Sequence, residues 1–149
     1  MGALPWYYFI PYEPDIEQAF RGLRLREFQA GRYYPVVGIP QYPVLVNSAS
    51  PGAKHRTIEE AVEAAGPNGT RSILDMKGVS LTGPPRPGII VPLPAEKIVQ
   101  LYGSSFPTRP MIENNMDFFA GLDRGQGVFV VAFRQNTPDE LLFAGYSYD

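Results

Sequence analysis

Two polar side chains fall within otherwise apolar faces of predicted helices. Steps of about 100° per residue place Glu27 in the apolar arc of a helix expected over Ile16–Ala30. The same construction places Asn115 in the apolar arc of a helix expected over Thr108–Leu122. A buried carboxylate without a partner costs on the order of several kcal/mol. Glu27 must therefore be paired, be neutralised, or border a cavity.

Two interpretations of this pattern remain open. In one, Glu27 lies near the helix end, reaches solvent and bonds an arginine or a tyrosine hydroxyl. In the other, Glu27 and Asn115 line a pocket between helix and sheet, in which Glu27 acts as an acid/base group and a tyrosine orients a ligand. The tyrosines considered for this lining are Tyr7, Tyr8, Tyr33 and Tyr34, of which the last two are expected to be the most exposed.

His55 is the only histidine and a further candidate catalytic residue. It lies between Lys54 and Arg56, just before a predicted helix. The alternative is an ordinary loop histidine. A single histidine cannot form a metal site alone, and no serine has an obvious triad arrangement with it.

The standard catalytic and nucleotide-binding motifs are absent from the sequence. The chain has no cysteine, which excludes disulfides, zinc–thiolate sites and thiol nucleophiles. We therefore expect no metal and no cofactor.

Length and charge restrict the remaining classes of function. A chain of 149 residues with 44% hydrophobic residues is predicted to be one domain, residues 1–149. A net charge of −2 argues against a nucleic-acid partner. No apolar run approaches the length of a membrane span, and the N-terminus lacks a signal-peptide pattern. A cytoplasmic protein without a membrane partner is expected.

The first half of the chain shows clear helix signals. Asp15 is placed to cap the helix over Ile16–Ala30, which Gly31 ends. Thr57 and Glu60 form a capping box for a helix over Ile58–Ala65. The strands expected here cover Trp6–Tyr12, Arg32–Ile39 and Thr70–Lys77, and the residues from 41 to 56 read as a loop.

The second half predicts a terminal hairpin. Val and aromatic residues fill Gly127–Arg134 and the segment from Glu140 onward, with a polar turn between them. Both faces of the first strand are apolar, so it should lie inside the sheet. A short strand over Ile89–Pro92 and a helix over Pro94–Tyr102 precede it. The predicted fold class is α+β, a largely antiparallel sheet of about four to six strands with three or four helices packed on it.

Leu25 and Phe28 lie on the opposite side of the first helix, which makes that helix apolar on two sides. Either a loop covers them or another molecule does. One prediction is a homo-oligomer that buries Leu25 and Phe28 between copies.

Several sequence blocks together carry a resemblance: Tyr8–Tyr12, Arg26–Tyr33, Thr70–Met76, Glu113–Phe118, Gly125–Val131 and Phe143–Asp149. With them the chain resembles a group of uncharacterised small bacterial single-domain proteins. The resemblance implies a bacterial cytoplasmic protein and brings no activity and no catalytic residues.

The leading hypothesis is a small acidic, non-catalytic module that binds another protein. It would neutralise or regulate a basic partner, as immunity proteins neutralise toxins; the analogy is one of class and not of motif. The alternative is a small-ligand-binding protein or enzyme with a helix–sheet pocket, using Glu27 as acid/base group and His55 in assistance.

Overall fold

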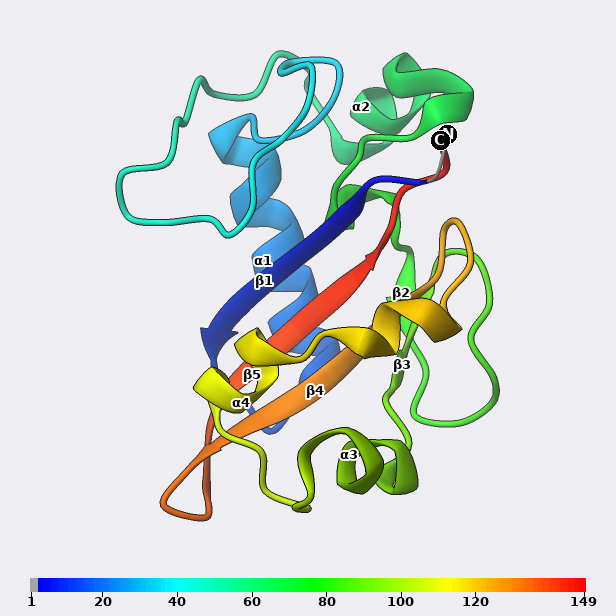
Figure 1. Cartoon of the computed structure of the whole chain (residues 1–149). Helices are drawn as coiled ribbons and strands as arrows, with labels where there is room; N and C mark the ends of the chain where they lie inside the picture. Colours follow the sequence, from blue (N-terminus) through cyan, green and yellow to red (C-terminus); the bar gives the residue numbers. More distant parts are fainter. Residues whose placement is uncertain (1–2) are drawn as a thin grey trace.

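A computed structural model describes residues 3–149 and shows a mixed five-stranded sheet with helices on both faces (Figure 1). The strands are β1 (Pro5–Pro11), β2 (Gly78–Val79), β3 (Ile89–Pro92), β4 (Gly127–Arg134) and β5 (Thr137–Tyr146). Their order in the sheet is β1-β5-β4-β3-β2. The β1·β5 and β5·β4 pairs are antiparallel, whereas β4·β3 and β3·β2 are parallel. The predicted α+β class and C-terminal hairpin are confirmed; the sheet is mostly antiparallel but mixed.

Four helices pack on this sheet: α1 (Ile16–Ala30), α2 (Ile58–Ala65), α3 (Ala95–Tyr102) and α4 (Arg109–Asn114). Figure 1 shows α1 behind the sheet and α4 in front of it. Asp15 Oδ1 accepts a hydrogen bond from Gln18 N–H at 3.0 Å, and Gly31 closes α1 with a φ of 75°. The predicted bounds and caps of α1 are therefore confirmed.

Each face of the sheet carries its own apolar core. On the α1 side, Phe129 and Phe143 pack with α1 residues such as Phe20. On the α4 side, Val128 and Val130 pack against Ile112 and other residues of that layer. β4 thus contributes side chains to both cores and is the middle strand of the five, as its two-sided apolar pattern predicted.

Two predicted strands are wrong. Residues 32–39 form turns, because Pro35 and Pro40 have no N–H to donate to a ladder. Residues 70–77 contain a short 3₁₀ helix, Ile73–Asp75, in place of a strand. There the side chains of Ser72 and Asp75 accept hydrogen bonds from nearby backbone N–H groups, which competes with strand pairing.

The helix predicted over Thr108–Leu122 is interrupted. α4 ends at Asn114, and a 3₁₀ helix follows over Asp117–Gly121. Asn115 between them has extended backbone angles, and its Oδ1 accepts a hydrogen bond from Asp117 N–H at 3.0 Å. Asn115 is therefore a cap residue and does not lie within an apolar helix face.

Among residues 3–149, the structure contains no helix with both the length and the apolar character needed to cross a membrane.

Candidate protein-binding surface

Glu27 is buried and holds an ion pair with Arg32. Arg32 Nε donates to Oε1 at 2.8 Å, and Nη2 donates to Oε2 at 2.7 Å. The hydrogen bonds to Glu27 raise the pKa of Arg32. The pair forms because Gly31 reverses the chain at the end of α1 and returns Arg32 to the last helical turn. The structure thus shows the arginine partner that one of the two sequence interpretations expected. The solvent contact that the same interpretation expected is wrong, because Glu27 is only 2% exposed.

Glu27 and Tyr8 border the same small cavity between α1 and β1, with a volume of about 140 Å³. The Tyr8 hydroxyl lies 3.0 Å from that of Tyr42 and accepts a hydrogen bond from Ile73 N–H at 3.3 Å. Burial raises the pKa of both Tyr8 and Tyr42, so both hydroxyls stay protonated at neutral pH. At about 30 Å³ per water, this cavity holds only a few water molecules.

Tyr33 and His55 form a second polar contact on the same side of the sheet. The Tyr33 hydroxyl lies 2.8 Å from His55 Nδ1, and Lys54 N–H donates to that hydroxyl at 3.4 Å. Tyr33 is fully buried, so its expected exposure is wrong; its ring stacks on Phe28. This contact ties the segment before α2 to the core.

Asn115 lies on the other side of the sheet from Glu27. Its side-chain Nδ2 donates to Leu101 O at 3.2 Å, and its carbonyl accepts a hydrogen bond from the Tyr102 hydroxyl at 2.7 Å. These bonds join α3 to the end of α4. The structure therefore does not bring Glu27 and Asn115 together, and the pocket expected to contain both is not formed.

Tyr34 is half-buried, and the guanidinium of Arg71 lies 4.5 Å from its ring centroid. Arg71 also forms an ion pair with Asp149 at 2.8 Å. Tyr34 thus helps to position Arg71 and does not reach the cavity beside Glu27.

The apolar pair Leu25 and Phe28 is not a shared surface. Leu25 is 48% exposed, but Phe28 is only 7% exposed and stacks on Tyr33 at 5.9 Å between ring centroids. Phe28 is covered because the chain after Gly31 folds back over it. A homo-oligomer that buries both side chains is therefore not supported.

Among the described residues, three of the seven exposed large apolar side chains lie on the loop Val36–Ala53, an 18-residue segment with no charged residue. Ile39 is 58% exposed, Leu45 is 56% exposed and Val46 is completely exposed. Exposed apolar side chains that lie together mark interaction sites in soluble proteins, and Leu45 and Val46 are neighbours in the chain. The sequence predicts only a loop over residues 41–56; the lack of charge over 18 residues is the signal that could have indicated a contact surface.

Hydrogen bonds hold this loop in place. Arg71 Nη1 donates to Gly38 O at 2.6 Å, and Gly52 N–H donates to Ala30 O at 2.9 Å. Leu45 N–H donates to the Ser48 hydroxyl at 2.7 Å. The exposed apolar side chains therefore project from an ordered segment, which lowers the entropic cost of binding.

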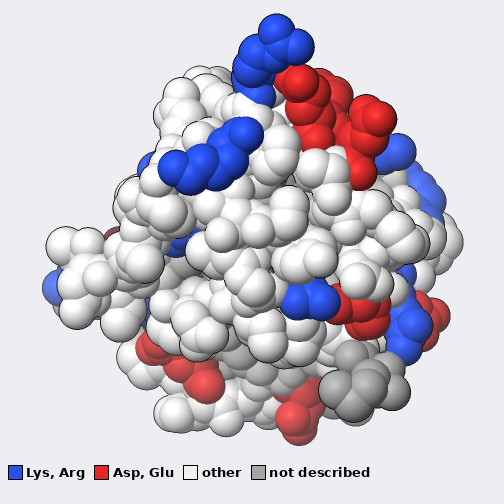
Figure 2. Space-filling view, turned by 90° about the horizontal axis from the view of Figure 1, so that it is seen from above, with Lys and Arg blue, Asp and Glu red and all other residues white. Residues whose placement is uncertain are grey.

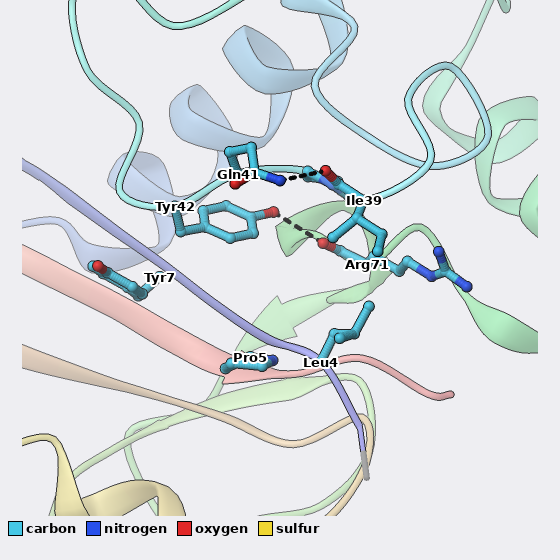
Figure 3. A pocket seen from close by; sticks show the side chains of 8 residues that line it. Leu4, Pro5, Tyr7, Ile39, Gln41, Tyr42 and Arg71 are labelled. Carbon is cyan, nitrogen blue, oxygen red and sulfur yellow. Dashed lines mark hydrogen bonds between the residues drawn. The ribbon is translucent and has the colours of Figure 1, made fainter. Parts of the chain in front are cut away.

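A cavity of about 220 Å³ separates this loop from β1 (Figure 3). The loop contributes Ile39, Gln41 and Tyr42 to one side of it, and Pro5 and Tyr7 lie on the other. The Tyr42 hydroxyl donates to Arg71 O at 2.9 Å at the back of the cavity. Tyr42, which connects the loop to the core, is not among the tyrosines predicted from the sequence.

The end of the molecule where the loop and α2 lie has a broad uncharged area (Figure 2). Basic and acidic side chains gather mainly toward the margins of this view. An uncharged centre with a charged rim is the usual anatomy of a protein interface.

No family model, no curated protein and no solved structure matches this chain. The resemblance to small bacterial proteins and the expected cytoplasmic location stay predictions.

Proposed function

We propose that this chain is a protein-binding module and that the loop Val36–Ala53 is its contact surface. The observation that carries the proposal is the exposure of Ile39, Leu45 and Val46 on an ordered, uncharged loop. Full burial of an exposed apolar side chain contributes about 1.5–3 kcal/mol, so these three can supply the apolar centre of a larger interface. Neutralising or regulating the partner, in the manner of an immunity protein, is the role that fits a module of this kind.

The composition of the loop also indicates the polarity of the partner surface that would fit it. Because the segment has no charged residue, it offers no electrostatic attraction to a basic protein. The partner surface that fits it is apolar, and affinity should depend only weakly on salt concentration.

An acid/base role for Glu27 has less support. Both oxygens of its carboxylate already accept hydrogen bonds from Arg32. The ion pair favours a structural role, in which it closes the end of α1 against the following segment.

The test is capture of the partner from the native host, followed by affinity measurements with purified components. Val46→Asp places a charge at the centre of the loop and should weaken binding at least about tenfold, or about 1.4 kcal/mol. Leu81→Asp is the matched control, because Leu81 is 66% exposed but lies in the link before β3.

Failure to recover any stoichiometric partner would count against the proposal. Equal affinities for the Val46→Asp and Leu81→Asp proteins would show that the loop is not the contact surface.

A further inference from the structure

A further cavity, of about 360 Å³, opens on the α4 side of the sheet. It lies between β3, β4, α3 and the 3₁₀ helix Asp117–Gly121, and prolines of the link before β3 close one side of it. Among the described residues that line it, none belongs to the loop Val36–Ala53. This cavity is therefore separate from the proposed contact surface.

The walls of this cavity are mainly apolar. Its floor consists of residues of the α4-side core that are at most 8% exposed, namely Val91, Leu93, Phe118, Leu122 and Val128. Four prolines also line it: Pro84, Pro85, Pro92 and Pro94. Proline side chains have almost no rotamer freedom to lose, so such walls cost little entropy when a ligand binds. A concave apolar site of this size is typical of small-molecule pockets.

The polar side chains of the cavity all come from α3. Glu96, Lys97 and Gln100 are the three lining residues of this kind. Lys97 is half-buried, whereas Glu96 and Gln100 are exposed. Consecutive helical residues project about 100° apart, so this difference in exposure indicates that the Lys97 stem lies along the cavity wall and that Glu96 turns toward solvent.

Lys97 brings an uncompensated positive charge to the mouth of the cavity. Within residues 3–149, its ammonium group has no ion-pair partner. The floor of the cavity offers no charged side chain, so a charged ligand group must stay at the mouth, where water and Lys97 compensate it. The cavity therefore fits a ligand with an apolar body and one anionic end.

The volume of the cavity limits the size of such a ligand. At about 30 Å³ per non-hydrogen atom, which is the share of a water molecule in the liquid, the cavity admits about twelve of them. A carboxylate is the smallest anionic group that accepts hydrogen bonds from both an ammonium and an amide, and Gln100 supplies the amide beside Lys97.

We propose that this cavity is a binding site for a small carboxylic acid. The apolar body of the acid, of about ten carbon atoms, packs on the floor formed by the α4-side core. Its carboxylate pairs with Lys97 at the mouth. The site does not rest on the proposed function, because it uses the opposite side of the sheet from α1 and no residue of the loop Val36–Ala53.

The first test is a titration of the whole chain with phenylbutyrate, followed by NMR of backbone amides and methyl groups. Phenylbutanamide and phenylbutylamine are the matched neutral and cationic probes. We expect phenylbutyrate to bind with a Kd below about 1 mM, and the amide to bind at least about threefold more weakly. The largest shift changes should fall on methyl groups of Val91, Leu93, Leu122 and Val128.

Three results of this titration would overturn the proposal. Absence of saturable binding up to about 10 mM would show that the cavity takes no ligand of this class. Equal affinities for phenylbutyrate and phenylbutanamide would show that the anionic end is not recognised. Shift changes that spare the four methyl-bearing residues would show that the acid binds elsewhere.

The second test is Lys97→Met, which keeps most of the apolar stem and removes the charge. Affinity for phenylbutyrate should fall by about threefold to tenfold, and affinity for phenylbutanamide should stay the same. Lys54→Met is the control, because it changes the net charge equally but lies in the exposed segment before α2. Equal affinities of the two variants for phenylbutyrate would contradict the role of Lys97.

The third test fills the cavity mouth through Gly121, which lines it. A Cβ atom added at Gly121 meets no other atom within 4 Å, so Gly121→Leu should be accepted without a clash. It should weaken phenylbutyrate and phenylbutanamide alike. Gly22→Leu on α1 has the same open surroundings and should change neither affinity.

Unchanged binding by Gly121→Leu would contradict the location of the site. Should Gly121→Leu fail to fold, the methyl shift changes in the unaltered chain decide the location.

Discussion

At the scale of single residues, two buried carboxylates near α1 differ in how their oxygens are paired. Glu27 is satisfied by Arg32, whereas Asp75 is only half satisfied. Asp75 Oδ1 accepts hydrogen bonds from the Thr70 N–H at 2.7 Å and the Thr70 hydroxyl at 2.8 Å, but Oδ2 is buried without a partner in the described residues. Two carboxylates at similar depth therefore differ in how fully their oxygens are hydrogen-bonded.

Removal of the Arg32 side chain should expose the cost of a buried charge. Arg32→Ala leaves Glu27 without a partner and should lower the free energy of unfolding by about 3 kcal/mol, measured by urea denaturation. Arg26→Ala is the control: Arg26 is exposed on the same helix, and its removal should change stability by less than about 0.5 kcal/mol. Similar losses for both variants would mean that the ion pair is not needed.

Asp75 should make stability fall as pH rises. Burial raises the pKa of Asp75, so between the unfolded pKa of about 3.9 and the raised value the folded chain holds a proton that the unfolded chain has lost. Its contribution is fully present below the unfolded pKa and is lost as pH rises through the folded pKa. The loss is about 1.4 kcal/mol for each unit by which the pKa is raised.

Asp75→Asn keeps the Oδ1 acceptor and removes this titration. The difference in unfolding free energy between the two proteins should therefore change across that window, to the disadvantage of the unaltered chain at higher pH. Thermal unfolding of both proteins from pH 4 upward measures it. A difference that does not vary with pH would show that Asp75 is ionised in the folded state at all these values.

At the scale of elements, the C-terminal hairpin shows how local geometry sets register. Gln135 and Asn136 both have positive φ, 51° and 61°, so they form a two-residue turn of the kind that fits strand twist. The turn is shorter than the polar segment Gln135–Asp139 expected from sequence, and β5 begins at Thr137. Pro138 is tolerated because β1 pairs with β5 only from Glu140 onward.

A better turn sequence should stabilise this hairpin. Gln135→Asn with Asn136→Gly supplies the residues that accept positive φ and should raise the free energy of unfolding by about 1 kcal/mol. Gln135→Val, a β-branched residue at the same position, should lower it by a similar amount. Chemical denaturation measures both, and equal stability of the two proteins would contradict the turn geometry.

At the scale of the whole molecule, two cores share one sheet. The α1-side core contains Trp6, the only tryptophan, and the α4-side core contains Ile112 and Phe118. β4 and β5 contribute residues to both cores, so neither can be exposed without breaking the same strands. The two layers are therefore connected through β4 and β5, although the two cores consist of different residues.

The chain should therefore unfold in one cooperative step. Trp6 fluorescence reports the α1-side core, and far-UV circular dichroism reports all helices and strands. Their denaturation curves should coincide, with the same midpoint and slope. Two separated transitions would show that the α4 layer unfolds independently of the strands it covers.

The sequence by itself determined the elements whose signals are local. Asp15, Gly31 and Thr57 fixed the ends of two helices, because a cap is satisfied by atoms within one turn. The apolar faces of Gly127–Arg134 fixed β4 as an interior strand. The interruption of the predicted strand at Pro35 and of the predicted helix at Asn115 also has a local cause, namely backbone hydrogen bonding near each residue. The path that the chain takes after each interruption depended on partners that are distant in the chain.

Only the tertiary structure decided which side chains meet. It paired Glu27 with Arg32, buried Tyr33 beside Phe28 and placed Asn115 on the opposite side of the sheet, so the expected pocket did not form. It also left Ile39, Leu45 and Val46 exposed and β1 at an edge. The helical or strand period specifies the face of its own element on which a side chain lies. Which residue packs against that face depends on how the other elements of the chain are arranged around it.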